Sequence, residues 1–459
     1  MKFIDDFIVG IAIYAVMFWG LFECGGGGFL VIGSVLMVLF AIYHCIFCSI
    51  VKFQSYWKHQ FSFLLIPSWV VVYEYSRHLV AYSYDESGLT FALIGQFTPT
   101  VITRSLAAIG GIWLLSFVMA FLIWLVVFFF NHRQRRYVQA ISLCGLAALS
   151  WVFIAKNRFD HACSWDAHNW LVTIPFPISS ISAPAVFEFV AEADSFEKES
   201  PIVVLGSETI LAIKMEGGEI EFDRPEDELW QDLSTRANRS VVVGAWILMD
   251  GREDRINAIV QFSEGEVVGV AAKHRLAPFV ESQPPGTKSL ISLGWLPDDA
   301  VRNATPPDVA EKLLADVPKP HGVQTGVCYD IFFGSAYLDG LNESHEFMTC
   351  SLDETYDDSG IFQWLSMQHS RIRAIEARRS LVRCSLGGIT AAFDPLGNEI
   401  QPIVSRAGMN LYRVPVCRES TFYSRTGDWI VWFSYIVVVS WMLHGEYERR
   451  RQRRQVDVV

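Results

Sequence analysis

The stretch "TGVCYDIFFG", Thr325 to Gly334, places one cysteine directly after a β-prone run and before an aromatic residue, a carboxylate and a second apolar run. A cysteine at a strand end is most often a small core residue. It can instead be a nucleophile when a base lies within hydrogen-bond reach, because the thiolate is the reactive form. The remaining sequence has to separate these two interpretations of Cys328.

The composition is that of a membrane protein. Of 459 residues, 51% are hydrophobic and only 19% are charged, which is more apolar than an ordinary soluble chain. The apolar runs are confined to two regions, so we expect N-terminal transmembrane helices over 1–155, a globular α/β domain over 156–425, and a C-terminal helix with a basic tail over 426–459. The middle region is long enough to bury its own core.

Six segments approach the roughly 20 apolar residues that a helix needs to cross a bilayer. The first has no small-residue cleavage site, so we interpret it as a retained helix rather than a signal peptide. The six are Phe7–Phe22, Phe29–Val51, Phe61–Tyr82, Ala107–Phe130, Val138–Ala155 and Trp429–Leu443.

The basic clusters predict the orientation of these helices. "KFQSYWKHQ" (Lys52–Gln60), "NHRQRR" (Asn131–Arg136) and "YERRRQRR" (Tyr447–Arg454) fall on one side if the six spans alternate, and the positive-inside rule makes that side the cytoplasm. The loop Tyr84–Gly88 and the 156–425 domain then face outward. In a bacterium this describes a multi-pass inner-membrane protein with a periplasmic domain.

The net charge is −12 despite the basic loops, so the globular part is acidic and nucleic acid is not an expected partner. The nine cysteines do not form an evident disulfide framework. Five lie outside the apolar spans, an odd number that leaves one unpaired unless it pairs between chains; they are Cys163, Cys328, Cys350, Cys384 and Cys417. "CIFC" (Cys45–Cys48) has redox spacing but lies inside a hydrophobic segment, so we expect no metal or redox role there.

Between 156 and 425, short β-rich runs alternate with helical patterns, which favours a layered α/β fold. The expected helices are Ser182–Phe196 and Ile361–Arg379. The expected strands are Ile202–Glu208, Ser240–Leu248, Ile256–Phe262, Val267–Lys273, Gly322–Asp330, Leu381–Leu386 and Ile389–Asp394.

Three of these strands end in a reactive side chain: Glu208, Lys273 and Cys328. Strands of one sheet present their ends along one edge, so the three groups can converge. A carboxylate can take the proton of the thiol, and an ammonium favours the thiolate and stabilises an oxyanion. Together they suffice for acyl transfer through a thioester, although each residue alone has a simpler interpretation as a core thiol or a surface charge.

Several motifs, in their order along the chain, resemble the nitrilase (carbon-nitrogen hydrolase) superfamily. "LGSE", "KHRLAPFVE" and "GVCYD" are similar to its Glu, Lys and Cys motifs, and the best match is the apolipoprotein N-acyltransferase branch. The segment "SLDETYDDSGIFQWLSMQHSRIRAIEARRSLVRCSLGGITAAFDPLG" resembles that branch's loop, helix and strand pair after the cysteine. "WVVVYEYSR" and "AAIGGIWLLSF" resemble two of its membrane helices.

The resemblance implies a nitrilase-like four-layer αββα sandwich fused to an all-α transmembrane helix bundle. It implies Cys328 as the nucleophile, Glu208 as the general base, Lys273 as the stabiliser of the thiolate and oxyanion, and Glu281 as a supporting glutamate. Tyr329 and Asp330 would line the binding site. We expect no metal and no cofactor.

Two further candidates lie in the membrane part. Glu74 and Arg77 are spaced i to i+3 on the third expected span, and intramembrane charges are functional candidates by default. An ion pair that only anchors the helix is an equally good interpretation.

The sequence departs from the family pattern at several places. Gly206 and Ser207 precede the glutamate where proline is usual, Asp330 replaces a glutamate, Val280 replaces a glycine, and six spans are found where about eight are usual for the family.

The resemblance implies a membrane acyltransferase that moves a fatty acyl group from a phospholipid to an amine, the N-terminus of a lipoprotein. One alternative is a divergent relative that serves plasmid conjugal transfer with another acceptor or role. Another is a membrane-anchored amidase or hydrolase that uses water, and a non-catalytic scaffold is a fourth. We expect a monomer.

Overall fold

The computed structural model describes the chain in segments. They are residues 2–17, 62–85, 90, 93–98, 101–131, 164–177, 183–196, 202–216, 219–224, 227–236, 239–278, 280–283, 285–294, 304–357 and 360–456, with single positions at 34, 37, 38, 40–42, 44, 45, 145 and 150. The expected spans 29–51 and 138–155 lie largely outside them. So do the basic segment 52–60, nearly all of 131–136, and Cys24, Cys48, Cys144 and Cys163.

The larger of two β-sheets contains nine of the described strands in the order β13-β14-β1-β2-β5-β3-β4, with β6 and β7 added beside β5. The long strand β5 pairs in parallel with β2 through its first half and with β3 through its second half. The strands are β1 (Ser164–Ile174), β2 (Ile202–Gly206), β3 (Leu211–Glu216), β4 (Glu219–Phe222), β5 (Arg239–Met249), β6 (Arg255–Ser263), β7 (Glu266–Ala272), β13 (Val404–Arg406) and β14 (Met409–Val416).

The smaller sheet has the order β12-β11-β10-β9-β8. Its three strands β8, β9 and β10 are parallel, so their carboxyl ends lie along one edge. The strands are β8 (Val323–Val327), β9 (Phe347–Asp353), β10 (Ser380–Leu386), β11 (Ala391–Phe393) and β12 (Glu399–Ile400).

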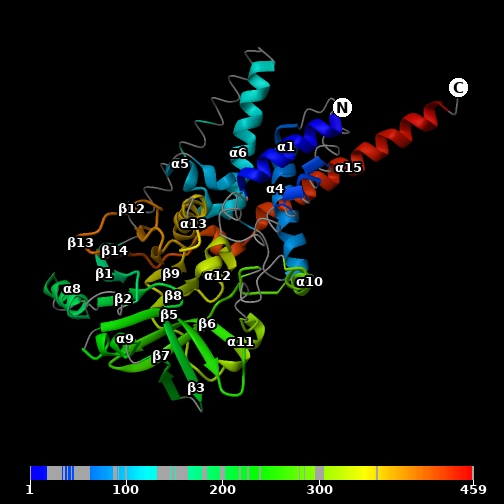
Figure 1. Cartoon of the computed structure of the whole chain (residues 1–459). Helices are drawn as coiled ribbons and strands as arrows, with labels where there is room; N and C mark the ends of the chain where they lie inside the picture. Colours follow the sequence, from blue (N-terminus) through cyan, green and yellow to red (C-terminus); the bar gives the residue numbers. More distant parts are fainter. Residues whose placement is uncertain are drawn as a thin grey trace.

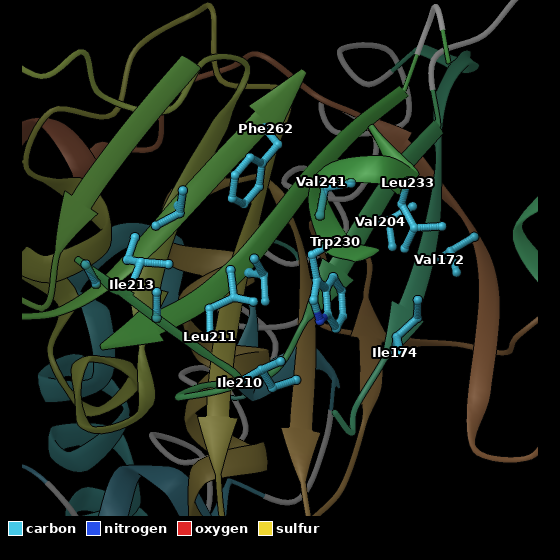
Figure 2. Close-up of a cluster of buried hydrophobic side chains, with 14 of the residues drawn as sticks. Val172, Ile174, Val204, Ile210, Leu211, Ile213, Trp230, Leu233, Val241 and Phe262 are labelled. Atoms are coloured by element: carbon cyan, nitrogen blue, oxygen red, sulfur yellow. The ribbon is translucent and has the colours of Figure 1, made fainter. Parts of the chain in front are cut away.

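The two sheets pack face to face between two layers of helix. Alternate residues of a strand point to opposite faces, so Val203 and Leu205 face the smaller sheet while Ile202 and Val204 face outward. The outward face of the larger sheet is covered by α8 (Ala183–Phe196), α9 (Glu228–Leu233) and α11 (Pro307–Leu313), around a core whose largest fully buried side chain is Trp230 (Figure 2). The outer face of the smaller sheet carries α12 (Gly334–Leu338) and α13 (Ile361–Ala377).

This arrangement is the predicted four-layer α/β sandwich, and all seven expected strands and both expected helices are present within a few residues of their predicted bounds. Strands β1, β3, β4, β9, β12, β13 and β14 were not predicted. β12 and β13, of two and three residues, are too short to show a period.

The described helices of the chain's two ends gather on one side of the sandwich (Figure 1). They are α1 (Lys2–Met17), α4 (Ser62–Asp85), α6 (Ala107–Asn131) and α15 (Trp429–Val456), and α4 packs against both α6 and α15. Within α6 and α15, the stretches Ala107–Val126 and Trp429–Gln452 are long and apolar enough to cross a membrane. Helix α4 carries Glu74 and Arg77 and does not meet the same test. The six-helix bundle therefore stays a prediction.

Helix α6 is broken near its start and is held to the sandwich there. Gly110 and Gly111 have non-helical backbone angles, and Gly111 has a φ of 62° that suits glycine. The N–H of Ile112, freed by the break, donates to the Glu376 carboxylate on α13 at 2.8 Å. Burial raises the pKa of Glu376 to about 7, while Arg373, whose guanidinium lies 2.9 Å away, favours its charged form.

Replacing Glu376 by Gln should flatten the pH dependence of stability. The pKa of Glu376 lies above its ordinary value of 4.5, so the folded chain binds more protons than the unfolded chain between the two values, and the native protein loses stability as the pH rises through this window. Gln keeps an acceptor for the Ile112 N–H but does not titrate. The free energy of unfolding of the Glu376→Gln variant should be lower than that of the native protein, because Arg373 loses its counter-ion.

Thermal unfolding midpoints in detergent at pH 5 and pH 8 measure this difference. The control is Glu399→Gln, an exposed partner of Arg371, which should leave the slope of the native protein unchanged. An equal pH slope in Glu376→Gln and the native protein would contradict the assignment.

Candidate active site

Glu208 is placed by the turn that follows strand β2. Its N–H donates to the carbonyl of Leu352 at 3.3 Å, and its Oε2 accepts from the N–H of Asp353 at 3.0 Å, both at the end of β9 in the other sheet. Gly244 on β5 lets this turn approach closely, because a Cβ there would lie 2.6 Å from the Glu208 Cα. The carboxylate is therefore fixed between the two sheets and buried.

Lys273 follows strand β7 and meets two carboxylates. Its Nζ lies 3.0 Å from Glu208 Oε1 and 2.7 Å from Glu281 Oε2, and all three side chains are at most 5% exposed. Asn257 on β6 ties the two acids together, since its Nδ2 donates to Glu208 Oε1 at 2.7 Å and to Glu281 Oε1 at 2.6 Å. The sequence-predicted Glu208, Lys273 and Glu281 thus form one buried charged cluster.

Cys328 begins a tight turn, η4 (Cys328–Phe332), directly after strand β8. Its φ is 44°, in the left-handed region that a non-glycine residue rarely adopts. Such strained positions cost about 1–3 kcal/mol and gather at functional sites. The thiols of Cys350 and Cys384 are buried, whereas Cys328 keeps some exposed surface.

The charged cluster acts on the thiol. Burial raises the pKa of Cys328 well above its ordinary value, the charge of Glu208 raises it further, and the charge of Lys273 lowers it. Burial also raises the pKa of Glu208, against the attraction of Lys273. For Lys273 burial opposes the charged form, but the two carboxylates outweigh it and raise its pKa well above the usual range. Lys273 is thus an ammonium, and the resting Cys328 is a protonated thiol that feels the charges of Glu208 and Lys273.

Asp330 fixes the lysine loop to the cysteine turn. Its Oδ1 accepts from the N–H of Arg275 at 2.8 Å, and its Oδ2 accepts from the N–H groups of His274 at 3.2 Å and Val327 at 3.0 Å. Asp330 is fully buried. We predicted Asp330 as a binding residue. In the structure its carboxylate contacts the backbone of the lysine loop and the backbone just before the cysteine turn.

The other predicted binding residues lie farther out. Tyr329 is buried in the apolar cluster under the smaller sheet, with its ring 5.2 Å from that of Phe333. Glu74 on α4 accepts from the N–H of Ile94 at 2.6 Å and is near enough to Arg77 for their charges to interact. Both α4 residues are buried beside the loop before α6, away from the Lys273 cluster.

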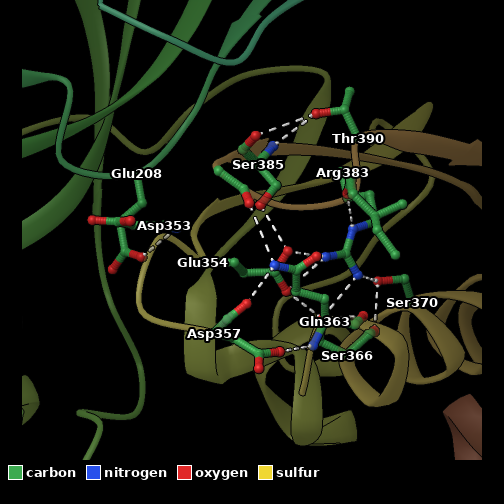
Figure 3. A network of polar contacts seen from close by, with 12 residues as sticks. Glu208, Asp353, Glu354, Asp357, Gln363, Ser366, Ser370, Arg383, Ser385 and Thr390 are labelled. Atoms are coloured by element: carbon green, nitrogen blue, oxygen red, sulfur yellow. Dashed lines mark hydrogen bonds and ion pairs between the residues drawn. The ribbon is translucent and has the colours of Figure 1, made fainter. Parts of the chain in front are cut away.

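A second buried ion pair supports the end of β9 next to Glu208 (Figure 3). Arg383 Nη2 donates to both oxygens of Glu354, at 2.8 and 2.7 Å, and both side chains have no exposed surface. Ser366 and Ser385 also donate to Glu354. Because the N–H of Asp353, one residue earlier, donates to Glu208, this network supports the Glu208 carboxylate from behind.

Sequence analysis missed these supporting residues. Asn257 is a polar residue within the largely apolar strand β6, and that interruption was an available signal. For Glu354 and Arg383 we find no comparable signal, because their pairing joins two strands.

The segment before α6 also contacts the cysteine turn. Thr90 Oγ1 donates to the carbonyl of Phe332 at 2.7 Å, and Gln96 Oε1 lies 2.9 Å from a ring nitrogen of His369 on α13. His369 packs its ring against Phe332, with centroids 4.8 Å apart. The helical part and the cysteine turn therefore form one packed unit.

A cavity of about 1040 Å³ reaches Lys273 and Glu281. Its walls come from the lysine loop, from α12 behind the cysteine turn, from the segment leading into α11, and from Tyr82 near the end of α4. Within the part of the chain that the structure describes, no group of three or more His, Cys, Asp or Glu side chains could hold a metal ion. The arrangement offers a base, an ammonium and a thiol, which is the equipment of acyl transfer.

Replacing Asp330 by Asn should loosen the cysteine turn. Both oxygens of Asp330 accept N–H groups, whereas Asn has one oxygen and one NH₂ group that cannot accept. Losing a hydrogen bond to a buried charged acceptor costs about 1.5–3 kcal/mol. The thiol should then become more accessible to water, its pKa should fall toward the ordinary value, and iodoacetamide should alkylate Cys328 several-fold faster. Peptide mapping by mass spectrometry measures that rate.

Asp394→Asn is the matched control. Asp394 also accepts N–H groups, from Leu396 and Asn398 at 2.8 Å, but in a remote turn. It should cost stability without changing the alkylation of Cys328. Unchanged stability and alkylation in Asp330→Asn would show that the three contacts do not hold the turn.

No family model matches the chain. Curated proteins named apolipoprotein N-acyltransferase do match it at low identity. Apolipoprotein N-acyltransferase 2 from Treponema denticola is 21% identical over 319 residues, and the match covers 66% of this chain and 56% of that protein. The protein from Pseudomonas syringae is 22% identical, over 74% of this chain and 66% of its own length. That from Haemophilus influenzae is 29% identical, over 34% of this chain and 30% of its own length. The chain thus spans less than two thirds of these relatives.

Solved structures similar to the chain include nitrilase-superfamily proteins. Nit3 of Saccharomyces cerevisiae is 13% identical with a TM-score of 0.36, covering 57% of this chain and 94% of its own. An amidase from Nesterenkonia is 12% identical with a TM-score of 0.35, and the match covers 60% of this chain and 98% of the amidase. The resemblance inferred from the sequence motifs is confirmed: the chain has distant homologues named apolipoprotein N-acyltransferase.

Proposed function

We propose that this chain is a membrane acyltransferase that moves a fatty acyl group from a phospholipid, through a thioester on Cys328, to an amine at the N-terminus of a lipoprotein. The observation that carries the proposal is the buried contact of Lys273 with Glu208 and Glu281, whose charges act on the Cys328 thiol. Distant homology to proteins named apolipoprotein N-acyltransferase supports the lipid and lipoprotein substrates.

In the first half-reaction the Cys328 thiol gives its proton to Glu208, and the thiolate attacks the ester carbonyl of the phospholipid. The negative charge that develops on the carbonyl oxygen is stabilised by the Lys273 ammonium. The carbon–oxygen bond then breaks, and the departing alkoxide takes the proton back from Glu208 to leave as a lysophospholipid. The acyl group stays on the sulfur as a thioester.

In the second half-reaction the neutral amine of the acceptor attacks the thioester carbonyl. Glu208 accepts the proton that the amine loses, and Lys273 again faces the developing oxyanion. The carbon–sulfur bond breaks, and the sulfur recovers a proton from Glu208. The products are an amide and the starting thiol, so the two substrates react in turn with double-displacement kinetics.

The proposed location is a bacterial inner membrane with the sandwich in the periplasm. The apolar helices α6 and α15 lie on the same side of the sandwich, which would hold the site at the level of lipid ester groups (Figure 1). Cys417, at the end of β14, is disulfide-bonded. Disulfides persist in oxidising compartments and are rare in the cytosol, which supports a periplasmic sandwich.

The competing functions differ in the acceptor. A hydrolase would pass the same acyl group to water, and a relative that serves conjugal transfer would pass it to a different amine or have another role. The buried Glu208–Lys273 contact is compatible with each of these, so the acceptor has to be tested by experiment.

Replacing Cys328 by Ala should abolish acyl-enzyme formation while the protein remains folded, since the side chain lost is small. Purified full-length protein in detergent is incubated with phospholipid labelled in the acyl chain, and the adduct is detected after gel separation. A thioester is released by neutral hydroxylamine, and peptide mapping locates it.

Cys350→Ala is the control thiol. Burial raises the pKa of Cys350 to about 12, so its removal should leave the adduct in place. An equal adduct on Cys328→Ala would refute the assignment. Chasing the native adduct with a diacylglyceryl-cysteine peptide or with buffer alone then separates transfer from hydrolysis: rapid loss to buffer alone would favour the hydrolase.

A further inference from the structure

Arg275 is held between the end of helix α4 and the cysteine turn. Its guanidinium carbon lies 4.9 Å from the ring centroid of Tyr82 on α4 and 5.6 Å from that of Phe333, which directly follows η4. Its backbone N–H is fixed by Asp330 at 2.8 Å. A cation stacked on aromatic rings has a restricted position, so the charge of Arg275 is kept close to where the helical part meets the site.

Arg275 lines the space that leads to Lys273. Arg275, Tyr82 and Lys273 all line the same cavity of about 1040 Å³. Arg275 is only two residues along the chain from Lys273, yet it is partly exposed whereas Lys273 is buried. A molecule that reaches Lys273 through this cavity would therefore pass within reach of Arg275.

Helix α4 also places His78 near Arg275. His78 is close enough to Arg275 for the charge of the guanidinium to act on it, and its ring lies 5.8 Å from that of Phe333. We call Arg275, together with Tyr82 and His78 of α4, the α4 corner; Arg275 supplies its charge. Because α4 packs with the two apolar helices α6 and α15, this corner lies where those helices meet the sandwich.

The chemistry of the corner separates the two substrates of the proposed reaction. A phospholipid carries a phosphodiester on the glycerol carbon next to an ester, whereas the acceptor offers an amine and no phosphate. Guanidinium groups match phosphate oxygens with paired hydrogen bonds and are weakly hydrated. An amine that becomes an ammonium would be repelled at the same place.

We propose that Arg275 binds the phosphate of the donor phospholipid in the first half-reaction and so makes the enzyme select phosphate-bearing esters over neutral glycerides. The proposal rests on the proposed function for the identity of the donor. It assigns Arg275 no part in the second half-reaction, in which no phosphate is bound.

The first test measures binding without reaction. An ether-linked phosphatidylglycerol, which has no ester to transfer, is titrated into the full-length protein in non-ionic detergent, and the ether-linked diglyceride with the same chains serves as the neutral probe. Arg275→Gln should weaken binding of the phospholipid at least tenfold and change binding of the diglyceride less than twofold. Arg275→Lys should lie between, because it keeps the charge and loses the paired geometry.

Arg371→Gln is the matched control. Arg371 is also a partly exposed arginine stacked on an aromatic ring, 5.2 Å from the Phe393 centroid, but it lies outside the residues that line the cavity. It should leave both bindings unchanged. If Arg275→Gln weakens both probes equally, or neither, Arg275 only supports the structure and the proposal is overturned.

The second test follows single-turnover acylation of Cys328. The phospholipid rate should fall at least tenfold in Arg275→Gln, the diacylglycerol rate should stay within twofold, and loss of the acyl group to the amine should be unchanged. A slower amine step would contradict the assignment to the donor. Absence of any thioester in the native protein would refute the proposed function, whereas the binding test would still decide the role of Arg275.

Discussion

The ammonium of Lys273 is buried between the carboxylates of Glu208 and Glu281, and the rest of the site depends on this contact. Charges are expensive to remove from water, and a buried set persists only when its members are paired and hydrogen-bonded. Here Asn257 donates to both acids and the N–H of Asp353 donates to Glu208. The charges of this cluster act on the thiol of Cys328.

Residues from many parts of the fold hold this charged cluster in place. Glu208, Lys273 and Cys328 follow strands β2, β7 and β8, and Glu281 lies in the loop after β7, so the four groups come from parts of the chain spread over more than a hundred residues. Gly244 makes room for the Glu208 turn, Asp330 joins the lysine loop to the cysteine turn, and the Glu354–Arg383 pair supports the end of β9. The larger sheet thus supplies the acid and the ammonium, and the smaller sheet supplies the thiol.

The sequence predicted the parts whose signals are local. The strand runs ending in Glu208, Lys273 and Cys328 are visible as apolar stretches, and the motifs around them indicated that these ends meet, together with Glu281. It did not reveal that Asp330 joins two loops, that Asn257 bridges two acids, or that Arg383 pairs with Glu354, because those contacts connect residues distant in sequence. Tyr329 was expected at the site for its position next to the cysteine, but the strained turn directs its ring into the apolar cluster.

The most direct test of the account is the rate of acylation of Cys328 in Glu208→Gln. Glutamine has nearly the same shape and keeps an oxygen for the Asp353 N–H, but it cannot take the proton of the thiol. A positioned base contributes roughly 10²–10⁴-fold, so the account predicts a single-turnover rate at least a hundredfold below that of the native protein, with unchanged affinity for an ether-linked phospholipid. A rate equal to that of the native protein would contradict the account.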